Sequence, residues 1–320
     1  MNQAENASKA LAPVAVYTYT RFHHLINTLE ALRKNHLASQ SVIYVVSDGA
    51  SQPEHERAVG QIRDYVDNLT GFREVVRVYR ESNYGLRRSI PEAEKMILAD
   101  HGKIISMEDD NITSANYLDF INAGLEYFED DETVYSVCGY CPPLLSSGQI
   151  NNGDDFWRYA WNMSWGYGIW KKKYDRFHPL RNRYIELSQN GLLARQNRAG
   201  GLYVSDSLKR DFLGQKYFPD AILCTDMFEA NMHAIIPTIS KVQNTGQDGS
   251  GQSTKQSTHK YDVDLDRGQQ RVFDFSRESS CAELYRVGAR KFFNGSQLTQ
   301  WARKLGVYHR LSELHERWKG

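Results

Sequence analysis

Lys103-Ile104-Ile105-Ser106-Met107-Glu108-Asp109-Asp110-Asn111 is the stretch that decides the fold, because a short apolar run ends there in three consecutive acids. A run of this length with paired isoleucines predicts a buried strand. Three adjacent carboxylates cannot lie inside a core, since each unpaired buried charge is costly. We therefore expect Glu108, Asp109 and Asp110 at the carboxyl edge of a sheet, where open α/β folds bind their ligands.

The acid triplet admits two interpretations. Carboxylate oxygens suit a hard cation such as Mg²⁺ or Mn²⁺, which takes its remaining ligands from water and substrate phosphates. That interpretation predicts a metal–diphosphate site. The other interpretation is a solvated acidic turn that caps the next helix, and the stretch alone does not choose between them.

Length and composition set broad limits. The chain has 320 residues, with 39 basic and 39 acidic side chains, so its formal net charge is zero. A protein built to bind nucleic acid would carry a basic excess, so we expect no nucleic-acid partner. No run of 18 apolar residues occurs, and the N-terminus has no signal-peptide core. These features predict a cytoplasmic protein.

Strands and helices alternate through the first half of the chain. Strands are predicted at 14–20, 41–46, 74–79, 103–108 and 133–138, with helical patterns between them. This alternation predicts a mainly parallel sheet covered on both faces. No G-x-G-x-x-G follows the first strand and no G-x-x-x-x-G-K-[ST] occurs, so a dinucleotide fold and a P-loop both fit poorly.

The second half changes character. Residues 157–170 hold four tryptophans, which indicate either core packing or an aromatic loop that contacts a ligand. Asp226 is predicted near the start of an apolar helix, where it is either a helix N-terminal acid or a positioned base. A strand is predicted at 237–242. The loop 244–259 is rich in Gly, Ser, Thr and Gln, and it is either a plain connection or a lid over a ligand.

The C-terminal residues 261–320 form a helical extension in this interpretation. Apolar residues recur near helical spacing from Leu298 to Trp318. Such a face could dock on the domain, pair with a second subunit or lie on a membrane surface.

Together these motifs resemble the nucleotide-sugar glycosyltransferases of the GT-A fold, of the N-acetylglucosaminyltransferase I type and its bacterial polysaccharide-synthesis relatives. The likeness covers about residues 13–259. It implies a nucleotide-binding half at 13–140 and an acceptor-binding half at 141–260, after a disordered segment at 1–12. It also implies a Rossmann-like, mainly parallel α/β sheet flanked by helices.

The resemblance assigns roles residue by residue. Asp110, the last acid of the triplet, matches the family's ligand for Mn²⁺ or Mg²⁺. Asp226 matches the catalytic base. The nucleotide contacts match Thr18, Arg21, Asp48, Arg87, Glu108 and Asp109, of which Asp48 would recognise uracil and Arg87 matches only loosely. The sugar or acceptor contacts match Trp165, Gly166, Tyr167 and, in the Gly-rich loop, Asp248.

The implied reaction is an inverting transfer from a nucleotide-diphosphate sugar, with UDP favoured, to a hydroxyl of a glycan or lipid-linked glycan in bacterial surface polysaccharide synthesis. That role implies a cytoplasmic enzyme at the inner face of the membrane. Two alternatives remain at this point. A sugar-1-phosphate nucleotidyltransferase would need a Gly-rich loop after the first strand, which Thr18-Tyr19-Thr20-Arg21 lacks. A non-catalytic carbohydrate-binding protein would explain the tryptophans but not the acids at a strand end.

Overall fold

The structure is a computed structural model that describes residues 10–144, 153–176, 183–215, 218–251, 257–295, 297–305 and 307. Within these residues an eight-stranded sheet crosses the molecule in the order β3-β2-β1-β4-β8-β6-β9-β7. Six of its strands run in one direction, and β8 and β7 run opposite to their neighbours. The predicted α/β fold with a mainly parallel sheet is confirmed.

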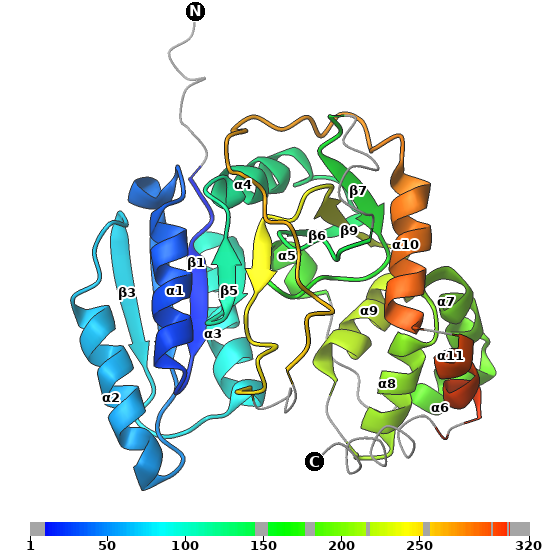
Figure 1. The fold of residues 1–320 in the computed structure, drawn as a ribbon, viewed down its shortest axis with the longest axis horizontal. Helices are drawn as coiled ribbons and strands as arrows, with labels where there is room; N and C mark the ends of the chain where they lie inside the picture. The colour runs from blue at the N-terminus through cyan, green and yellow to red at the C-terminus, as the bar shows by residue number, and fades with distance from the viewer. Residues whose placement is uncertain are drawn as a thin grey trace, which may run out of the picture.

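The first four strands form the parallel half of the sheet, shown on the left of Figure 1. β1 lies between β2 and β4, so the end of the first strand lies beside the end of the acid-tipped strand. The elements of this half are β1 (Val14–Thr18), α1 (Phe22–Arg33), a 3₁₀ turn η1 (Ala38–Gln40), β2 (Val42–Ser47), α2 (Pro53–Asp67), β3 (Glu74–Tyr79), α3 (Leu86–His101) and β4 (Lys103–Glu108).

The sheet continues into the second half without a break. It adds α4 (Tyr117–Tyr127), β6 (Val134–Cys138), β7 (Phe156–Tyr159), β8 (Tyr167–Trp170), α5 (Lys171–Tyr174) and β9 (His233–Pro237). Two short strands, β5 (Asn111–Thr113) and β10 (Val242–Asn244), form a separate antiparallel pair directly after the acid triplet. This pairing holds the loop after β10 close to the acid triplet.

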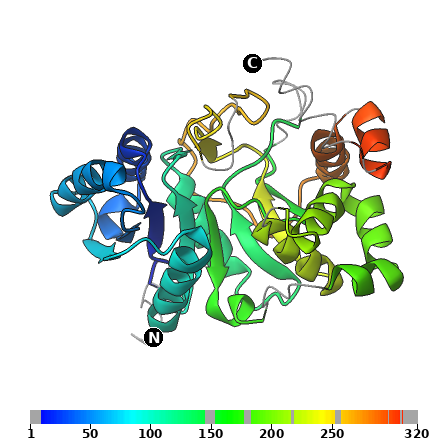
Figure 2. The ribbon, with the colours of Figure 1, turned by 90° about the horizontal axis from the view of Figure 1, so that it is seen from below.

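Helices gather at the far end of the sheet from α1 and α2, as Figures 1 and 2 both show. They are α6 (Tyr184–Gln189), α7 (Leu192–Gly200), α8 (Tyr203–Phe212), α9 (Pro219–Glu229), α10 (Ala282–Asn294) and α11 (Gln297–Lys304). Among the described residues, no helix is long and apolar enough to cross a bilayer.

The two faces of the sheet are covered by different helices. The hydroxyl of Ser106 in β4 donates to the Glu94 carboxylate of α3 at 2.8 Å, so α3 covers the face to which Ser106 points. Gly168 in β8 is paired with Ile105, which points to the other face, and it packs against Leu125 of α4. Since side chains alternate along a strand, Glu108 faces the α3 side.

Four secondary-structure predictions need correction. The aromatic stretch, for which core packing and a ligand-contacting loop were both open, contains two strands that were not predicted, β7 and β8, and three of the four residues of each are buried. The strand predicted at 237–242 is wrong: Pro237, which lacks a donor, ends β9, and β10 begins only at Val242. Residues 184–196, whose sequence pattern predicts one helix, form the two helices α6 and α7, because the chain breaks at Gly191, whose φ of +75° favours glycine.

The fourth correction concerns the helix that carries Asp226. Pro219 occupies its first turn and starts it, as proline commonly does, so Asp226 lies in the last turn rather than at the beginning. In the C-terminal extension α10 and α11 confirm the helical prediction, whereas its end, from Tyr308 to Trp318, lies outside the described residues.

Candidate active site

The acid triplet stands at the end of β4, as expected, and the strand's alternation sends its members to different sides. Asp109 points toward β1 and α1, where its Oδ2 accepts a hydrogen bond from Thr18 Oγ1 at 2.9 Å. The Thr28 hydroxyl of α1 donates to the Asp109 carbonyl oxygen at 2.8 Å. Glu108 points instead toward the face that α3 covers.

Arg21 joins the two aspartates. It precedes the first residue of α1, and its guanidinium forms ion pairs with Asp109 and, at 2.8 Å from Nη2 to Oδ2, with Asp110. Burial raises the pKa of Asp109, and the Arg21 charge opposes that rise. The predicted grouping of Thr18, Arg21 and the triplet is therefore present in the structure.

The loop after β10 closes against Asp110. Asn244 Nδ2 donates to Asp110 Oδ1 at 2.7 Å, and the Thr245 backbone N–H donates to the Asp110 carbonyl at 2.8 Å. A Cβ on Gly246 would lie 1.9 Å from Asp110 Oδ2, so only glycine allows this approach. The sequence prediction missed Asn244 and Gly246, although a Gly after a short strand was a usable signal for close backbone contact.

The same loop is held to α1 by His24. One ring nitrogen lies 3.2 Å from Thr245 Oγ1, and the other lies 3.0 Å from Asp248 Oδ2. Hydrogen bonds from Ser250, supported by His24, lower the pKa of Asp248 to about 2. Asp248 thus anchors the loop to α1, and its predicted contact with a sugar or acceptor remains a prediction.

Asp220, on α9, is a further carboxylate that interacts electrostatically with Glu108. It lies in the first turn of α9, and its Oδ1 accepts a hydrogen bond from Ser164 Oγ at 2.7 Å. Asp220 is exposed as a whole residue, but desolvation of its carboxyl group raises its pKa, and the hydrogen bond from Ser164 opposes this rise. Burial and repulsion from Asp110, Asp220 and Asp109 raise the pKa of Glu108 to about 8, while Arg21 lowers it. Glu108 and Asp220 therefore repel each other electrostatically, and the pKa of each is raised.

The sequence prediction missed Asp220, because Asp226 had the better match to the family motif. Asp226 lies six residues further along α9, about 9 Å along the helix axis. Its electrostatic neighbours are Arg183 and Glu229, and burial is the main cause that raises its pKa to about 6. The Asp226 charge also helps to raise the pKa of Tyr135. Tyr135 is the second residue of β6, and Cys138 is the last. No hydrogen bond or ion pair joins Asp226 to the triplet among the described residues, and its role as the catalytic base remains a prediction.

Asp48 and Arg87 lie at the end of β2 and the start of α3. The buried Asp48 carboxylate accepts backbone N–H bonds from Gly49, Tyr84 and Gly85 at 2.8–2.9 Å. It therefore shapes the turn that leads into α3. Arg87 is the second residue of that helix and is exposed. Their predicted contacts with the nucleotide remain predictions.

The aromatic loop is divided between the site and the core. Ser164 bonds Asp220, and the Trp165 ring packs edge-on against Tyr140, with 4.6 Å between centroids. The carbonyl of Gly166, a residue with φ of +71°, accepts a hydrogen bond from the Gly139 N–H. The Tyr167 hydroxyl points to buried Glu94 at 3.4 Å, so its predicted role at the sugar lacks support from its orientation.

A metal on Asp110 does not fit this arrangement. Both Asp110 oxygens already accept N–H donors from Arg21 and Asn244. Asp109 is likewise bonded at both oxygens, by Thr18 and Arg21. No group of three or more His, Cys, Asp or Glu that could hold a metal ion occurs among the described residues.

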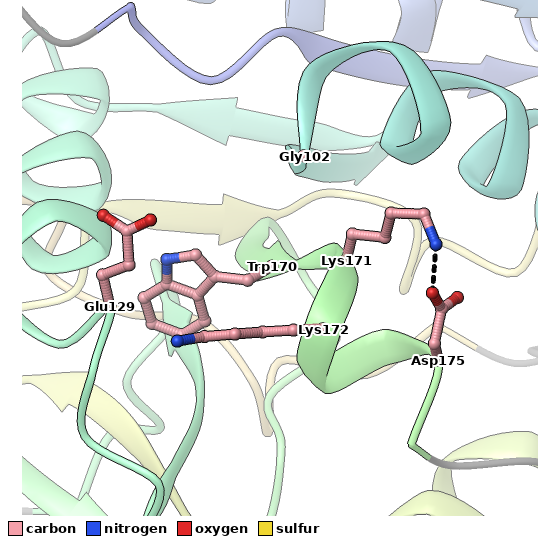
Figure 3. Close-up of a pocket in the computed structure, with 6 residues that line it drawn as sticks. All are labelled: Gly102, Glu129, Trp170, Lys171, Lys172 and Asp175. Atoms are coloured by element: carbon pink, nitrogen blue, oxygen red, sulfur yellow. Dashed lines mark hydrogen bonds and ion pairs between the residues drawn. The ribbon is translucent and has the colours of Figure 1, made fainter.

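A pocket of about 420 Å³ lies elsewhere, at the opposite edge of the sheet (Figure 3). It is lined by Gly102, Glu129, Trp170, Lys171, Lys172 and Asp175, and Lys171 pairs with Asp175. Gly102 directly precedes β4, so the length of that strand, about 17 Å, separates this pocket from Glu108. It is not part of the acid site.

No protein-family model and no curated protein sequence matches this chain. Among solved structures it is similar to S. aureus TarS, both as the fragment 1-349 (12% identity, TM-score 0.41, covering 73% of this chain and 60% of that one) and as the longer protein (11%, 0.40, 74% and 37%). It is also similar to a mannosyltransferase, PcManGT from Pyrobaculum calidifontis in complex with GDP-Man and Mn²⁺ (14%, 0.38, 68% and 68%). An active-site mutant of LgtC is a further match (11%, 0.33, 67% and 70%). Similarities this low assign no activity to the chain.

Proposed function

We propose that this chain is a glycosyltransferase that moves a sugar from a nucleotide-diphosphate donor to a hydroxyl of a glycan acceptor, with Asp220 as the general base. The observations that support the proposal are the hydrogen bond from Ser164 that holds Asp220 at the start of α9, the electrostatic repulsion between Asp220 and Glu108, and the Asp109–Arg21 ion pair at the end of β4. This edge is where α/β folds bind ligands. A UDP-sugar donor and a bacterial polysaccharide or lipid-linked acceptor follow from the sequence resemblance.

The proposed chemistry uses the groups on the two sides of the site. Asp220 Oδ2 takes the proton of the acceptor hydroxyl as that oxygen forms a bond to the anomeric carbon. The bond from the anomeric carbon to the diphosphate breaks, and the nucleoside diphosphate leaves with the electron pair, which gives inversion. The guanidinium of Arg21 lies where it can face the departing negative charge. Ser164 orients the Asp220 carboxylate through its bond to Oδ1.

A raised pKa suits a base that works near neutral pH. A base must be deprotonated to accept a proton, so desolvation that raises the Asp220 pKa moves the acid limb of the rate profile to a higher pH. We expect transfer to increase with pH across a midpoint above the ordinary aspartate value. A rate that is flat down to the ordinary aspartate value would contradict the role of Asp220.

The experiment compares two aspartates on one helix. Asp220→Asn should reduce transfer by about 10²–10⁴-fold, the usual contribution of a positioned base, while binding of UDP measured by calorimetry stays within severalfold. Asp226→Asn is the matched control and should leave transfer nearly unchanged. The assay measures nucleotide release from a panel of UDP-sugars, with and without glycan acceptors.

The outcomes show which aspartate is the base and whether the protein binds a nucleotide at all. Loss of transfer in Asp226→Asn and not in Asp220→Asn would return the base to the position that the sequence motif indicated. If UDP does not bind, titrations with GDP, CMP and dTDP follow. No binding of any nucleotide to the wild type would overturn the glycosyltransferase proposal and leave a carbohydrate-binding protein as the better interpretation.

A further inference from the structure

The side chains of Asp109 and Asp110 lie close together, and their charge needs compensation. Their exposed fractions are 5% and 6%, so water screens them little. Two carboxylates this close repel each other unless a positive group lies between them. In many proteins with adjacent acids that group is a divalent cation, and here Arg21 lies in that position.

Arg21 is fixed from both its backbone and its head group. It lies between β1 and α1, and its backbone carbonyl accepts the Leu25 N–H at 3.1 Å. The single nitrogen Nη2 contacts Asp109 Oδ1 and Asp110 Oδ2. The guanidinium thus sits between the two carboxylates.

The remaining directions around Asp110 are also filled. Asn244 Nδ2 donates a hydrogen bond to Asp110 Oδ1, and the backbone of Gly246 packs against Asp110 Oδ2. Mg²⁺ and ions of similar size bind oxygen at about 2.0–2.2 Å. An ion at that distance from the facing oxygens would meet Arg21 Nη2, with which it shares the sign of its charge.

We propose that Arg21 is the resident cation of the Asp109–Asp110 pair: in the nucleotide-free protein it takes the place of a divalent metal, and removing its charge converts the pair into a metal site. The inference deepens the proposed function, because it concerns the same site, but its test uses the metal alone and needs no activity. It replaces the sequence-based assignment of Asp110 as a ligand of Mn²⁺ in the free protein.

The test measures Mn²⁺ binding to the full chain without nucleotide, by the loss of the free Mn²⁺ signal in electron paramagnetic resonance. The wild type should show no saturable binding at millimolar metal. Arg21→Met keeps the length of the side chain and removes its charge, and it should bind Mn²⁺ at least about tenfold more tightly. Arg21→Lys keeps a cation and should behave like the wild type.

Two controls separate the site from a general effect of charge. Arg77→Met changes the net charge by the same amount on the edge strand β3, where Arg77 pairs with Asp67, and it should gain nothing. In the double variant Arg21→Met/Asp110→Asn the gained affinity should disappear. Thermal unfolding gives a second readout: Mn²⁺ should raise the Tm of Arg21→Met and leave that of the wild type unchanged.

Two results would overturn the inference. One is saturable Mn²⁺ binding to the nucleotide-free wild type that Asp110→Asn abolishes, and this arm needs no Arg21 variant to fold. The other is an Arg21→Met protein that folds and binds Mn²⁺ no better than the wild type. If no nucleotide binds, the glycosyltransferase proposal is contradicted, but these metal measurements are unaffected.

Discussion

At the scale of the residue, neighbouring acids have separate environments. Glu108 and Asp109 are adjacent in sequence, yet Glu108 faces Asp220 and has a pKa raised to about 8, whereas Asp109 is bonded to Thr18 and Arg21. The period of two along the strand causes this division. The triplet thereby directs one carboxyl group toward Asp220 and presents a pair compensated by Arg21 on the other side.

Asp226 provides a stability test at this scale. Burial raises its pKa from 3.8 to about 6, so the folded protein binds this proton more tightly than the unfolded chain does. Its contribution therefore falls as the pH rises from about 4 to 6 and stays unfavourable above that range. A shift of about two units corresponds to about 3 kcal/mol, which partial exposure reduces to about 1 kcal/mol.

We expect Asp226→Asn to increase the free energy of unfolding by about 1 kcal/mol above pH 6 and to have little effect below pH 4. Urea unfolding of both proteins across this pH range measures the difference. An equal effect at all pH values would show that titration of Asp226 is not its cause.

At the scale of the element, the short pair β5–β10 determines what can lie above Asp110. It brings residues 244–248 against the triplet, and Gly246 makes the closest approach. The sequence indicated a flexible Gly-rich loop there, and the structure shows that its first residues are tied down by Asp110 and His24.

Gly246→Ala tests this close approach. The added Cβ would lie 1.9 Å from Asp110 Oδ2 and 2.9 Å from Arg21 Nη1, so the loop must move. We expect a loss of about 1–3 kcal/mol in unfolding free energy, the usual cost of overpacking. Gly60→Ala is the matched control, because nothing lies within 4 Å of its Cβ and it is inside helix α2. That substitution should stabilise the protein by about 0.5–1 kcal/mol.

At the scale of the whole molecule, one sheet unites the predicted nucleotide and acceptor halves, since β8 is hydrogen-bonded to both β4 and β6. The C-terminal extension covers the far end of that sheet. Tyr285 of α10 stacks on the fully buried Trp157 of β7, with 5.3 Å between ring centroids and 15° between planes. At least this part of the extension belongs to the core.

Tyr285→Ala should therefore destabilise the whole protein by about 3–5 kcal/mol, as other truncations of large buried side chains do. Leu284→Ala is its neighbour on the same helix, and Leu284 is 51% exposed, so this control should change stability by less than about 0.5 kcal/mol. Thermal and urea unfolding compare the two. Equal, small effects would show that α10 is only loosely attached.

Much of the first half could be predicted because each of its elements has a local cause. Val42 to Ser47 and Glu74 to Tyr79 match the predicted strands within a residue, since apolar and β-branched runs bounded by turns leave few alternatives. The strands of the second half were harder to predict from the sequence. The aromatic residues of this half fill strands and loops alike, and packing of β7 against α10 and of β8 against α4 separates these strands from the connecting loop.

The sequence was enough to predict that three acids stand at the end of a buried strand, because charges cannot enter a core, and that Thr18 and Arg21 lie at the end of the first strand. Only the tertiary structure decided which further groups meet them. Asp220 and Asp226 lie on one helix, in its first and last turns, and Asp220 interacts electrostatically with Glu108 whereas the neighbours of Asp226 are Arg183 and Glu229. In the same way, the fold places the Arg21 guanidinium between two carboxylates 88 and 89 residues further along the chain, a contact that no local pattern encodes.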